Sequence, residues 1–380
     1  GIQGEAHRWF VDEQLVLDDV TGGAAVDSED TVAGDYTGRL GGRPGSHGDD
    51  YGGRHAIRLP TPWRAAGRVA AMYVDRVLLA DPRGFCAGVE MAIKALTWMV
   101  RAFDEPVYCY HEIVHNKLVV ERFTALGVVF VDDIADVPDG APVMLSAHGS
   151  APDVVSRAHE VGGYTVDAVC PLVTKVHNEA KKYHREGKKV VLVGHQGHQE
   201  VRGTMGQVEM TLIDGDSEEE LSAWADDQEV AVLTQTTLSV GDTAQAIDSI
   251  RDKFPNAVVR NDICYATTNR QEAVKAIAPK ADALLVIGAP NSSNSRRLVE
   301  VGSRAGCDYA QLVQRATDID WRSLEGIKSI GITAGASAPE QLINEVIDAF
   351  KDRYDVTTEM VETAVENVEF KVPRVLRVPA

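Results

Sequence analysis

The sequence contains few of the features that mark secreted, membrane-spanning or nucleic-acid-binding proteins. Its 380 residues include only five cysteines and no close cysteine pair, which is typical of reduced intracellular proteins. No apolar run reaches the roughly 20 residues that are needed to cross a bilayer. Acidic residues outnumber basic ones by 57 to 38, giving a net charge of −19, which argues against a general nucleic-acid or membrane surface. We therefore expect a cytoplasmic protein that binds neither nucleic acid nor membranes.

The first part of the chain differs in composition from the rest. Residues 1–71 are rich in glycine and contain no lysine, since the first lysine is Lys94. They follow neither the period of a strand nor that of a helix, which is typical of disordered segments. We predict a disordered extension over residues 1–71 and a folded protein over residues 72–380.

From Arg76 onward, short apolar runs alternate with helical patterns. Runs such as RVLLA, PVMLS, KVVLV and DALLVIG have the continuous apolar character of buried parallel strands. This alternation predicts an α/β protein with parallel sheets covered by helices on both faces. Many of the predicted strands end in polar turns, and ligands of open parallel sheets bind beyond the carboxyl ends of the strands. The site is therefore expected at these turns.

Three cysteines occupy equivalent places in the predicted fold. Cys86, Cys170 and Cys264 each follow a strand-like run and precede a helical pattern, at spacings of 84 and 94 residues. Such spacing predicts three similar units around one point, with three thiolate ligands and an open fourth position. Thiolates select zinc or iron–sulfur clusters, and the absence of the close ligand pairs of structural zinc sites favours a cluster. The remaining cysteines, Cys109 and Cys307, are interpreted as buried apolar residues.

Several histidines also fall at or near predicted strand ends. They are His111, His115, His148, His195 and His198. The segment HEIVH has the letters of a zinc-protease motif, with Glu112 as the base. The alternative is a strand–helix junction, because the segment directly follows the strand-like run PVYCY.

Hydroxyl and amide side chains are concentrated at the expected starts of later helices. They are Thr236, Thr237, Ser292, Ser293, Asn294 and Ser337. Such donors at a helix N-terminus suit a phosphate or diphosphate, although one serine alone could be an ordinary helix cap. No phosphate-binding GxxxxGK[ST] loop is present. Glu200, two residues after His198, is the carboxylate best placed to carry a proton.

These segments together resemble the 4-hydroxy-3-methylbut-2-enyl diphosphate reductase family of the non-mevalonate isoprenoid pathway. The resemblance covers residues 74–380 and keeps its order along the chain. Its motifs are ADPRGFCAGVEMAI, HEIVHN, SAHGS, DAVCPLVTKVH, GHQGHQEVRGTMGQ, TQTTLSVGDT, DICYATTNRQEAV, NSSNSRRL and TAGASAPE. The sequence departs from the family pattern in its N-terminal extension and at Asp81, where Asn or Ala is expected.

The resemblance implies a trefoil of three pseudo-equivalent α/β units around a central cluster cavity. The predicted units are residues 84–169, 170–263 and 264–350, with strand 75–83 completing the trefoil and residues 351–380 forming a tail. One [4Fe–4S] cluster would be held by Cys86, Cys170 and Cys264, which leaves one iron free for the substrate hydroxyl. The side chains that would bind the substrate are His115, His148, His198, Thr237, Ser292, Ser293, Asn294 and Ser337. His111 and His195 would support the site from outside.

The implied reaction is a reductive dehydroxylation. Two electrons from a ferredoxin or flavodoxin would remove the hydroxyl of 4-hydroxy-3-methylbut-2-enyl diphosphate and give isopentenyl and dimethylallyl diphosphate. Glu200, assisted by Thr236, would deliver the proton that lets the hydroxyl leave as water. Two alternatives are a cluster enzyme similar to quinolinate synthase and an iron–sulfur sensor. The hydroxyl-rich segments favour a diphosphate substrate over both.

Overall fold

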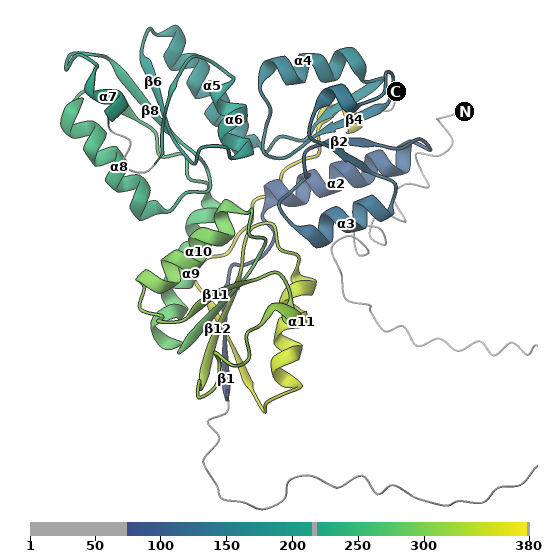
Figure 1. Ribbon diagram of the computed structural model, residues 1–380, viewed down its shortest axis with the longest axis vertical. Helices are drawn as coiled ribbons and strands as arrows, with labels where there is room; N and C mark the ends of the chain where they lie inside the picture. Colours follow the sequence, from purple (N-terminus) through teal and green to yellow (C-terminus); the bar gives the residue numbers. More distant parts are fainter. Residues whose placement is uncertain (1–73, 215–218, 378–380) are drawn as a thin grey trace, which may run out of the picture. The chain divides into compact units, whose positions relative to one another are not determined.

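The structure is a computed structural model that describes residues 74–214 and 219–377. The prediction for residues 1–71 lies outside this range. The described residues form three sheets in which every strand pair is parallel, and each sheet is accompanied by its own helices (Figure 1). The predicted α/β class with parallel sheets is therefore confirmed.

The first sheet has the strand order β3-β2-β4-β5. Its strands are β2 (Tyr108–Tyr110), β3 (Val129–Val131), β4 (Pro142–Leu145) and β5 (Tyr164–Asp167). The helices of this unit are α2 (Ala87–Ala102), α3 (Lys117–Ala125) and α4 (Pro152–Val161), with the 3-10 turn η2 (Ile134–Asp136). Buried side chains of α2, α3 and β4 share one apolar core, which fixes the helices on the sheet.

The second sheet has the strand order β7-β6-β8-β9. Its strands are β6 (Lys189–Val193), β7 (Thr211–Ile213), β8 (Val230–Thr234) and β9 (Val258–Val259). Its helices are α5 (Pro171–Arg185), α6 (Gln199–Met205), α7 (Glu219–Ser222) and α8 (Val240–Lys253). All five residues of β8 are buried, which explains the continuous apolar run that predicted this strand.

The third sheet combines both ends of the folded chain. Its order is β11-β10-β12-β1-β13, with β1 (Arg76–Asp81), β10 (Ala283–Ile287), β11 (Ala310–Val313), β12 (Ser329–Ala334) and β13 (Thr357–Glu362). Its helices are α9 (Tyr265–Ile277), α10 (Ser293–Arg304) and α11 (Glu340–Lys351), with turns η3 (Ala278–Lys280) and η4 (Ala316–Asp318). Strand β1 lies between β12 and β13, so that Leu79 is paired with both Ile332 and Met360.

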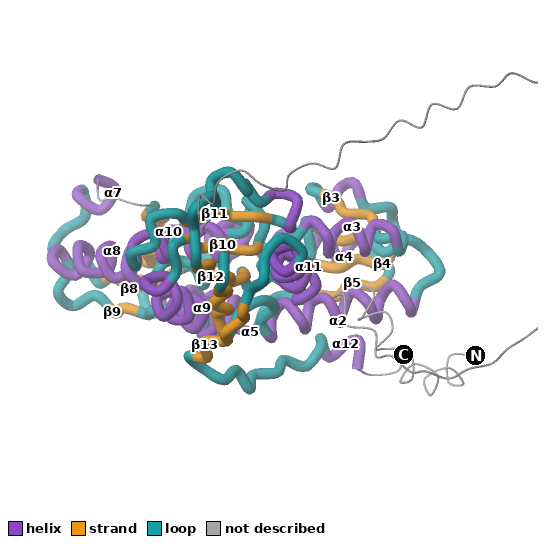
Figure 2. The backbone as a smooth tube through the Cα atoms, turned by 90° about the horizontal axis from the view of Figure 1, so that it is seen from below, coloured by secondary structure: helices purple, strands orange, loops and turns teal. Residues whose placement is uncertain are grey.

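The chain beyond residue 351, which the sequence analysis treats as a tail, takes part in two units. It first forms β13 at the edge of the third sheet. It then crosses to the first unit, where Val372 is buried in the core of α2 and the short helix α12 (Arg374–Arg377) contacts α2. Figure 2 shows the loop that leaves β13 and ends at α12. Within the described ranges, none of the helices has both the length and the apolarity that a membrane span requires.

Candidate active site

Each of the three predicted cysteine ligands occupies the residue immediately before a helix. Cys86, Cys170 and Cys264 are the N-cap residues of α2, α5 and α9. The preceding strands β1, β5 and β9 belong to three different sheets. All three cysteines line a single cavity of about 110 Å³. Because the N-terminal end of a helix favours negative charge, these positions suit thiolates.

The thiols lie close enough to influence one another. Burial raises the pKa of Cys170 to about 12 and that of Cys264 to about 11, and in both the neighbouring Cys86 adds to the increase. Burial also raises the pKa of Cys86. The protein's own side chains therefore do not provide enough positive charge to hold three thiolates. A metal-containing group would supply that charge.

The donor set fits a cluster better than a single metal ion. A single zinc requires its sulfur ligands to converge at about 2.3 Å from one point, and no group of three or more His, Cys, Asp or Glu side chains in residues 74–214 and 219–377 converges in this way. A cluster with several irons needs only one thiolate per iron, from positions further apart. Three thiols around one cavity match that requirement.

Gly88 provides part of the space beside the thiols. A Cβ atom at this position would lie 2.6 Å from Sγ of Cys170 and 3.9 Å from Sγ of Cys86. Optimal carbon contacts are about 3.5–4.0 Å long, so only glycine allows Cys170 to approach α2 as it does. The first turn of α2 therefore forms one wall of the site.

Three of the predicted histidines form a cluster in the same cavity. The His115 and His148 rings stack at 4.1 Å between centroids, and the His198 ring lies edge-on to them at 5.5 and 6.1 Å. Burial lowers the pKa of His198 to about 3 and that of His148 well below its ordinary value, and the neighbouring imidazoles add to both shifts. His148 and His198 are therefore neutral in the free protein, and a bound polyanion would favour their protonation.

The N-terminal end of α10 carries the predicted diphosphate donors. Ser292 is the N-cap and Ser293 and Asn294 follow it, all within the cavity lining. Asn294 is 3% exposed, and both polar atoms of its side chain lack a hydrogen-bond partner. Unsatisfied buried amides are costly, so this side chain is prepared for a polar ligand. Ser337 also lines the cavity and donates to the backbone oxygen of His115 at 2.9 Å.

Glu200 and Thr236 contact each other at the wall of the cavity. The Thr236 amide donates to one carboxylate oxygen of Glu200 at 2.6 Å, and the Thr236 hydroxyl donates to the other at 2.9 Å. Burial raises the pKa of Glu200 to about 7, although both hydrogen bonds oppose the increase. A carboxyl group with such a pKa can hold and release a proton near neutral pH.

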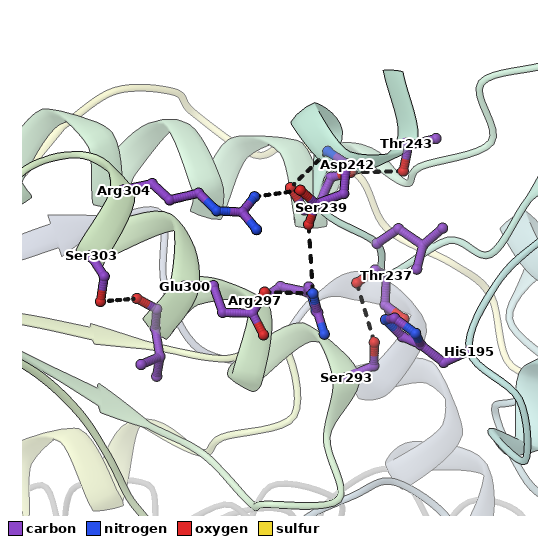
Figure 3. Close-up of polar contacts among 12 residues, drawn as sticks. His195, Thr237, Ser239, Asp242, Thr243, Ser293, Arg297, Glu300, Ser303 and Arg304 are labelled. Carbon is purple, nitrogen blue, oxygen red and sulfur yellow. Dashed lines mark hydrogen bonds and ion pairs between the residues drawn. The ribbon is translucent and has the colours of Figure 1, made fainter. Parts of the chain in front are cut away.

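Polar contacts connect α10 to the second sheet's helix α8 (Figure 3). Arg297 and Arg304 on α10 both pair with Asp242, in the first turn of α8. Near the cavity, the Ser293 hydroxyl donates to the backbone oxygen of Thr237 at 3.4 Å. The donors at the start of α10 are therefore held in position by the neighbouring unit.

Two predicted histidines lie outside the cavity lining. His111 contacts Asp132 at 3.2 Å and His195 contacts Asp214 at 3.1 Å, each through Nδ1. The zinc-protease hypothesis for HEIVH is wrong, because residues 111–115 lie in the loop between β2 and α3. That motif requires two histidines on one face of a helix.

Known proteins match most of the length of this chain. A sequence model described as "LytB protein" matches residues 77–351. The chain belongs to the LytB family. Proteins named 4-hydroxy-3-methylbut-2-enyl diphosphate reductase from Roseobacter denitrificans and Ruegeria pomeroyi are 59% and 57% identical to it. Each alignment spans 307 residues, 80% of this chain and 97% of the relative.

Solved structures confirm the fold of the LytB family for this chain. The E-1-hydroxy-2-methyl-but-2-enyl-4-diphosphate reductase from Plasmodium falciparum superimposes with a TM-score of 0.76 at 32% identity, over 80% of this chain and 97% of the other. A second structure, of (E)-4-hydroxy-3-methyl-but-2-enyl diphosphate reductase, gives a TM-score of 0.55 at 32% identity, over 73% and 99%. The family resemblance and the predicted trefoil of three parallel-sheet units are confirmed.

The sequence analysis missed several residues that line the LytB-family cavity. They include Val89, Tyr265, Thr267 and Phe370. Thr267 contacts Cys264 twice, through its hydroxyl at 3.2 Å and its amide at 3.4 Å from Sγ. Its position three residues after the N-cap cysteine is a usable signal, because an N-cap side chain bonds the amide of that residue. No local signal points to Phe370, which reaches the cavity from the C-terminal segment.

Proposed function

We propose that the protein is a 4-hydroxy-3-methylbut-2-enyl diphosphate reductase that converts this substrate to isopentenyl and dimethylallyl diphosphate. The reaction consumes two electrons and two protons and releases water. The observation that carries the proposal is the composition of one cavity. Three cysteines, three clustered histidines, the start of α10 and the Glu200 carboxyl all line it. Membership of the LytB family supports this activity. So do the relatives that are named 4-hydroxy-3-methylbut-2-enyl diphosphate reductase, which align with this chain over 97% of their own length.

The diphosphate would bind between the histidine cluster and the start of α10. Its negative charge would be stabilised by the N-terminal dipole of α10 and by hydrogen bonds from Ser292, Ser293 and Asn294. The rings of His115, His148 and His198 would donate hydrogen bonds to it, and the His148 and His198 rings would gain protons more readily once the anion is bound. Thr237 and Ser337 complete the polar lining.

Cys86, Cys170 and Cys264 would hold a [4Fe–4S] cluster. When bound, the cluster would supply single electrons and a Lewis-acidic iron beside the substrate hydroxyl. A ferredoxin or flavodoxin would be the electron donor. All three cysteines line the same cavity, and the Thr267 amide donates to the Cys264 sulfur from the first turn of α9. Hydrogen bonds to cluster sulfurs are one way in which proteins adjust such groups.

Glu200 would provide the proton with which the hydroxyl leaves as water. Because burial raises its pKa to about 7, a substantial fraction of the side chain carries a proton at neutral pH. Thr236 fixes the plane of the carboxyl group through its two hydrogen bonds. The buried position of Glu200, which is 4% exposed, limits exchange of this proton with bulk water.

The structure disfavours the two alternatives from the sequence analysis. A sensor has no need of a buried acid with a raised pKa beside its metal. A quinolinate synthase-like enzyme would need no diphosphate subsite, whereas the donors at the start of α10 are suited to bind a diphosphate. Family membership also separates the chain from both alternatives.

The decisive experiment is anaerobic purification followed by iron and sulfide analysis and a turnover assay. Cluster-loaded protein is incubated with 4-hydroxy-3-methylbut-2-enyl diphosphate and a chemical reductant. The expected products are isopentenyl and dimethylallyl diphosphate. If loaded protein forms neither of them, the proposed activity is wrong.

A further inference from the structure

Arg270 on α9 has a guanidinium group that is completely buried. The residue is 0% exposed and is the largest of the fully buried side chains in the described ranges. Its Nε and Nη2 atoms donate to the backbone oxygen of Gly84 at 3.0 and 2.7 Å, and Nη2 also donates to that of Phe85 at 3.0 Å. These two carbonyls directly precede Cys86. The guanidinium therefore holds the Cys86 loop against the helix that Cys264 caps.

The remaining donors of Arg270 reach the C-terminal segment, which we define as residues 363–373. Nη1 donates to Glu366 at 2.9 Å and to the backbone oxygen of Ala266 at 3.0 Å. The same Glu366 oxygen accepts a hydrogen bond from Asn269 at 3.0 Å, and the Glu366 side chain is only 15% exposed. Arg270 and Glu366 thus form a largely buried ion pair beside one cysteine of the site.

The same ion pair fastens the C-terminal segment over the cysteines. Four residues after Glu366, Phe370 lines the cavity together with Cys86 and Cys170, and Val372 is buried in the core of the first unit. Loss of the ion pair would remove a charge-assisted attachment of this segment to α9.

An ion pair in this position attaches the segment at a large cost in desolvation free energy. Burying two charges costs several kcal/mol per ion, and well-packed apolar residues often serve as well. A charge buried near a redox group has a second effect, because the field of that charge is weakly screened in the interior. The Arg270 guanidinium bonds the two carbonyl oxygens directly before Cys86, and the Glu366 carboxylate lies on the other side of that guanidinium, 2.9 Å from Nη1. Both charges therefore act on the cysteine site with opposite signs.

We propose that Arg270 and Glu366 are positioning residues that set the reduction potential of the cluster held by Cys86, Cys170 and Cys264. This proposal rests on the proposed function, since it requires the cluster. Reduction adds one negative charge to the cluster. The Arg270 cation stabilises the reduced form and the Glu366 carboxylate destabilises it. With both charges present, the reduction potential lies between the higher value expected with Arg270 alone and the lower value expected with Glu366 alone.

The test is a reduction potential measured on anaerobically reconstituted protein by a titration followed by electron paramagnetic resonance. Glu366→Gln removes the negative charge and is expected to raise the potential. A tenfold change in the reduction equilibrium, which is 59 mV for a one-electron couple, is the size we expect. Arg270→Gln is expected to lower the potential, whereas Arg270→Lys keeps the charge and should stay near the wild type.

Glu369→Gln is the matched control. Glu369 lies on the same segment but is exposed, so solvent screens its charge and its removal should leave the potential unchanged. A purely structural role predicts lower stability in the Arg270 and Glu366 variants without opposite shifts in potential. If Arg270→Gln does not fold, the comparison of Glu366→Gln with Glu369→Gln still decides the question.

The outcomes separate the two proposals. A wild-type protein that binds no cluster under anaerobic reconstitution contradicts the proposed function. A wild-type protein that binds the cluster, together with a Glu366→Gln variant whose potential equals that of Glu369→Gln, overturns only the role of the ion pair.

Discussion

Thr236 donates a hydrogen bond to each of the two carboxylate oxygens of Glu200, from its amide at 2.6 Å and from its hydroxyl at 2.9 Å. The two bonds fix the carboxyl plane at the cavity wall. Both favour the ionised form of Glu200, yet burial outweighs them and raises the pKa to about 7. Thr236 therefore limits the increase in the pKa of Glu200 and also orients its carboxyl group.

Glu200→Gln is expected to abolish most of the turnover without removing the cluster. Glutamine keeps the size of the side chain but cannot donate an acidic proton, and general acid catalysis typically contributes about 10²–10⁴-fold. We expect kcat to fall within that range while iron content and substrate affinity stay near the wild type. Glu209→Gln, at an exposed position nearby in the chain, is the control. Nearly normal kcat in Glu200→Gln would exclude this residue as the proton donor.

The pH dependence of turnover should follow the protonation of Glu200. The acid form is required, so kcat is expected to decline as the pH rises through about 7. The Thr236 hydroxyl bond lowers the pKa of Glu200, and Thr236→Val removes it. Because a net hydrogen bond contributes about 0.5–1.5 kcal/mol and one pKa unit corresponds to about 1.4 kcal/mol, the alkaline limb should move up by about one pH unit. Thr236→Ser should restore the wild-type profile, and an unchanged limb in Thr236→Val would contradict this assignment.

The sequence predicts the convergence of the cysteines better than the residues that support them. Strand-to-helix junctions are visible locally, and carboxyl ends of parallel strands are where ligands bind; the cavity indeed brings Cys86, Cys170 and Cys264 together. Their role as cluster ligands stays a prediction. The role of Arg270 cannot be predicted from local sequence, because its partners Gly84 and Glu366 are 186 and 96 positions away in the chain. Nothing in the helical pattern TNRQEAV distinguishes it from an exposed arginine.

The C-terminal strand was equally hard to predict. Strand β13 has the sequence TTEMVE and is almost entirely exposed, so it lacks the apolar run by which the other strands are identified. Its pairing with β1, which is about 280 residues earlier in the chain, depends on the completed sheet. A strand that is held at a sheet edge by backbone pairing cannot be recognised from its amino-acid composition.

Cys86→Ser, Cys170→Ser and Cys264→Ser should each lose most of the bound iron. A serine hydroxyl ionises far less readily than a thiol and is a harder ligand, so it does not replace a thiolate on iron. Cys109→Ala is the control, because Cys109 is buried in β2 and burial raises its pKa. Iron and sulfide analysis after anaerobic reconstitution provides the measurement. A variant of the first three that keeps full iron content would remove that cysteine from the ligand set.

Gly88→Ala should disturb cluster binding without unfolding the protein. The added Cβ would lie 2.6 Å from Sγ of Cys170, so the thiol must move away from its position. We expect a large loss of iron content with an unchanged circular dichroism spectrum. Gly241→Ala in α8 is the matched control, since its nearest neighbouring atom would be 3.8 Å away and alanine favours a helix. Equal iron content in the two variants would show that the approach of Cys170 to α2 is unimportant.

Asp242→Asn should weaken substrate binding from outside the cavity. Asp242 on α8 pairs with Arg297 and Arg304 on α10 (Figure 3), the helix whose first turn carries the proposed diphosphate donors. Partly exposed ion pairs contribute about 0.2–1 kcal/mol each, so we expect KM to rise a few-fold at low ionic strength and kcat to change less. The difference from the wild type should shrink as salt is added. Glu300→Gln is the control, because Glu300 pairs with Arg297 within α10 and does not connect the two helices. If Glu300→Gln raises KM as much as Asp242→Asn does, the connection between the units does not position these donors.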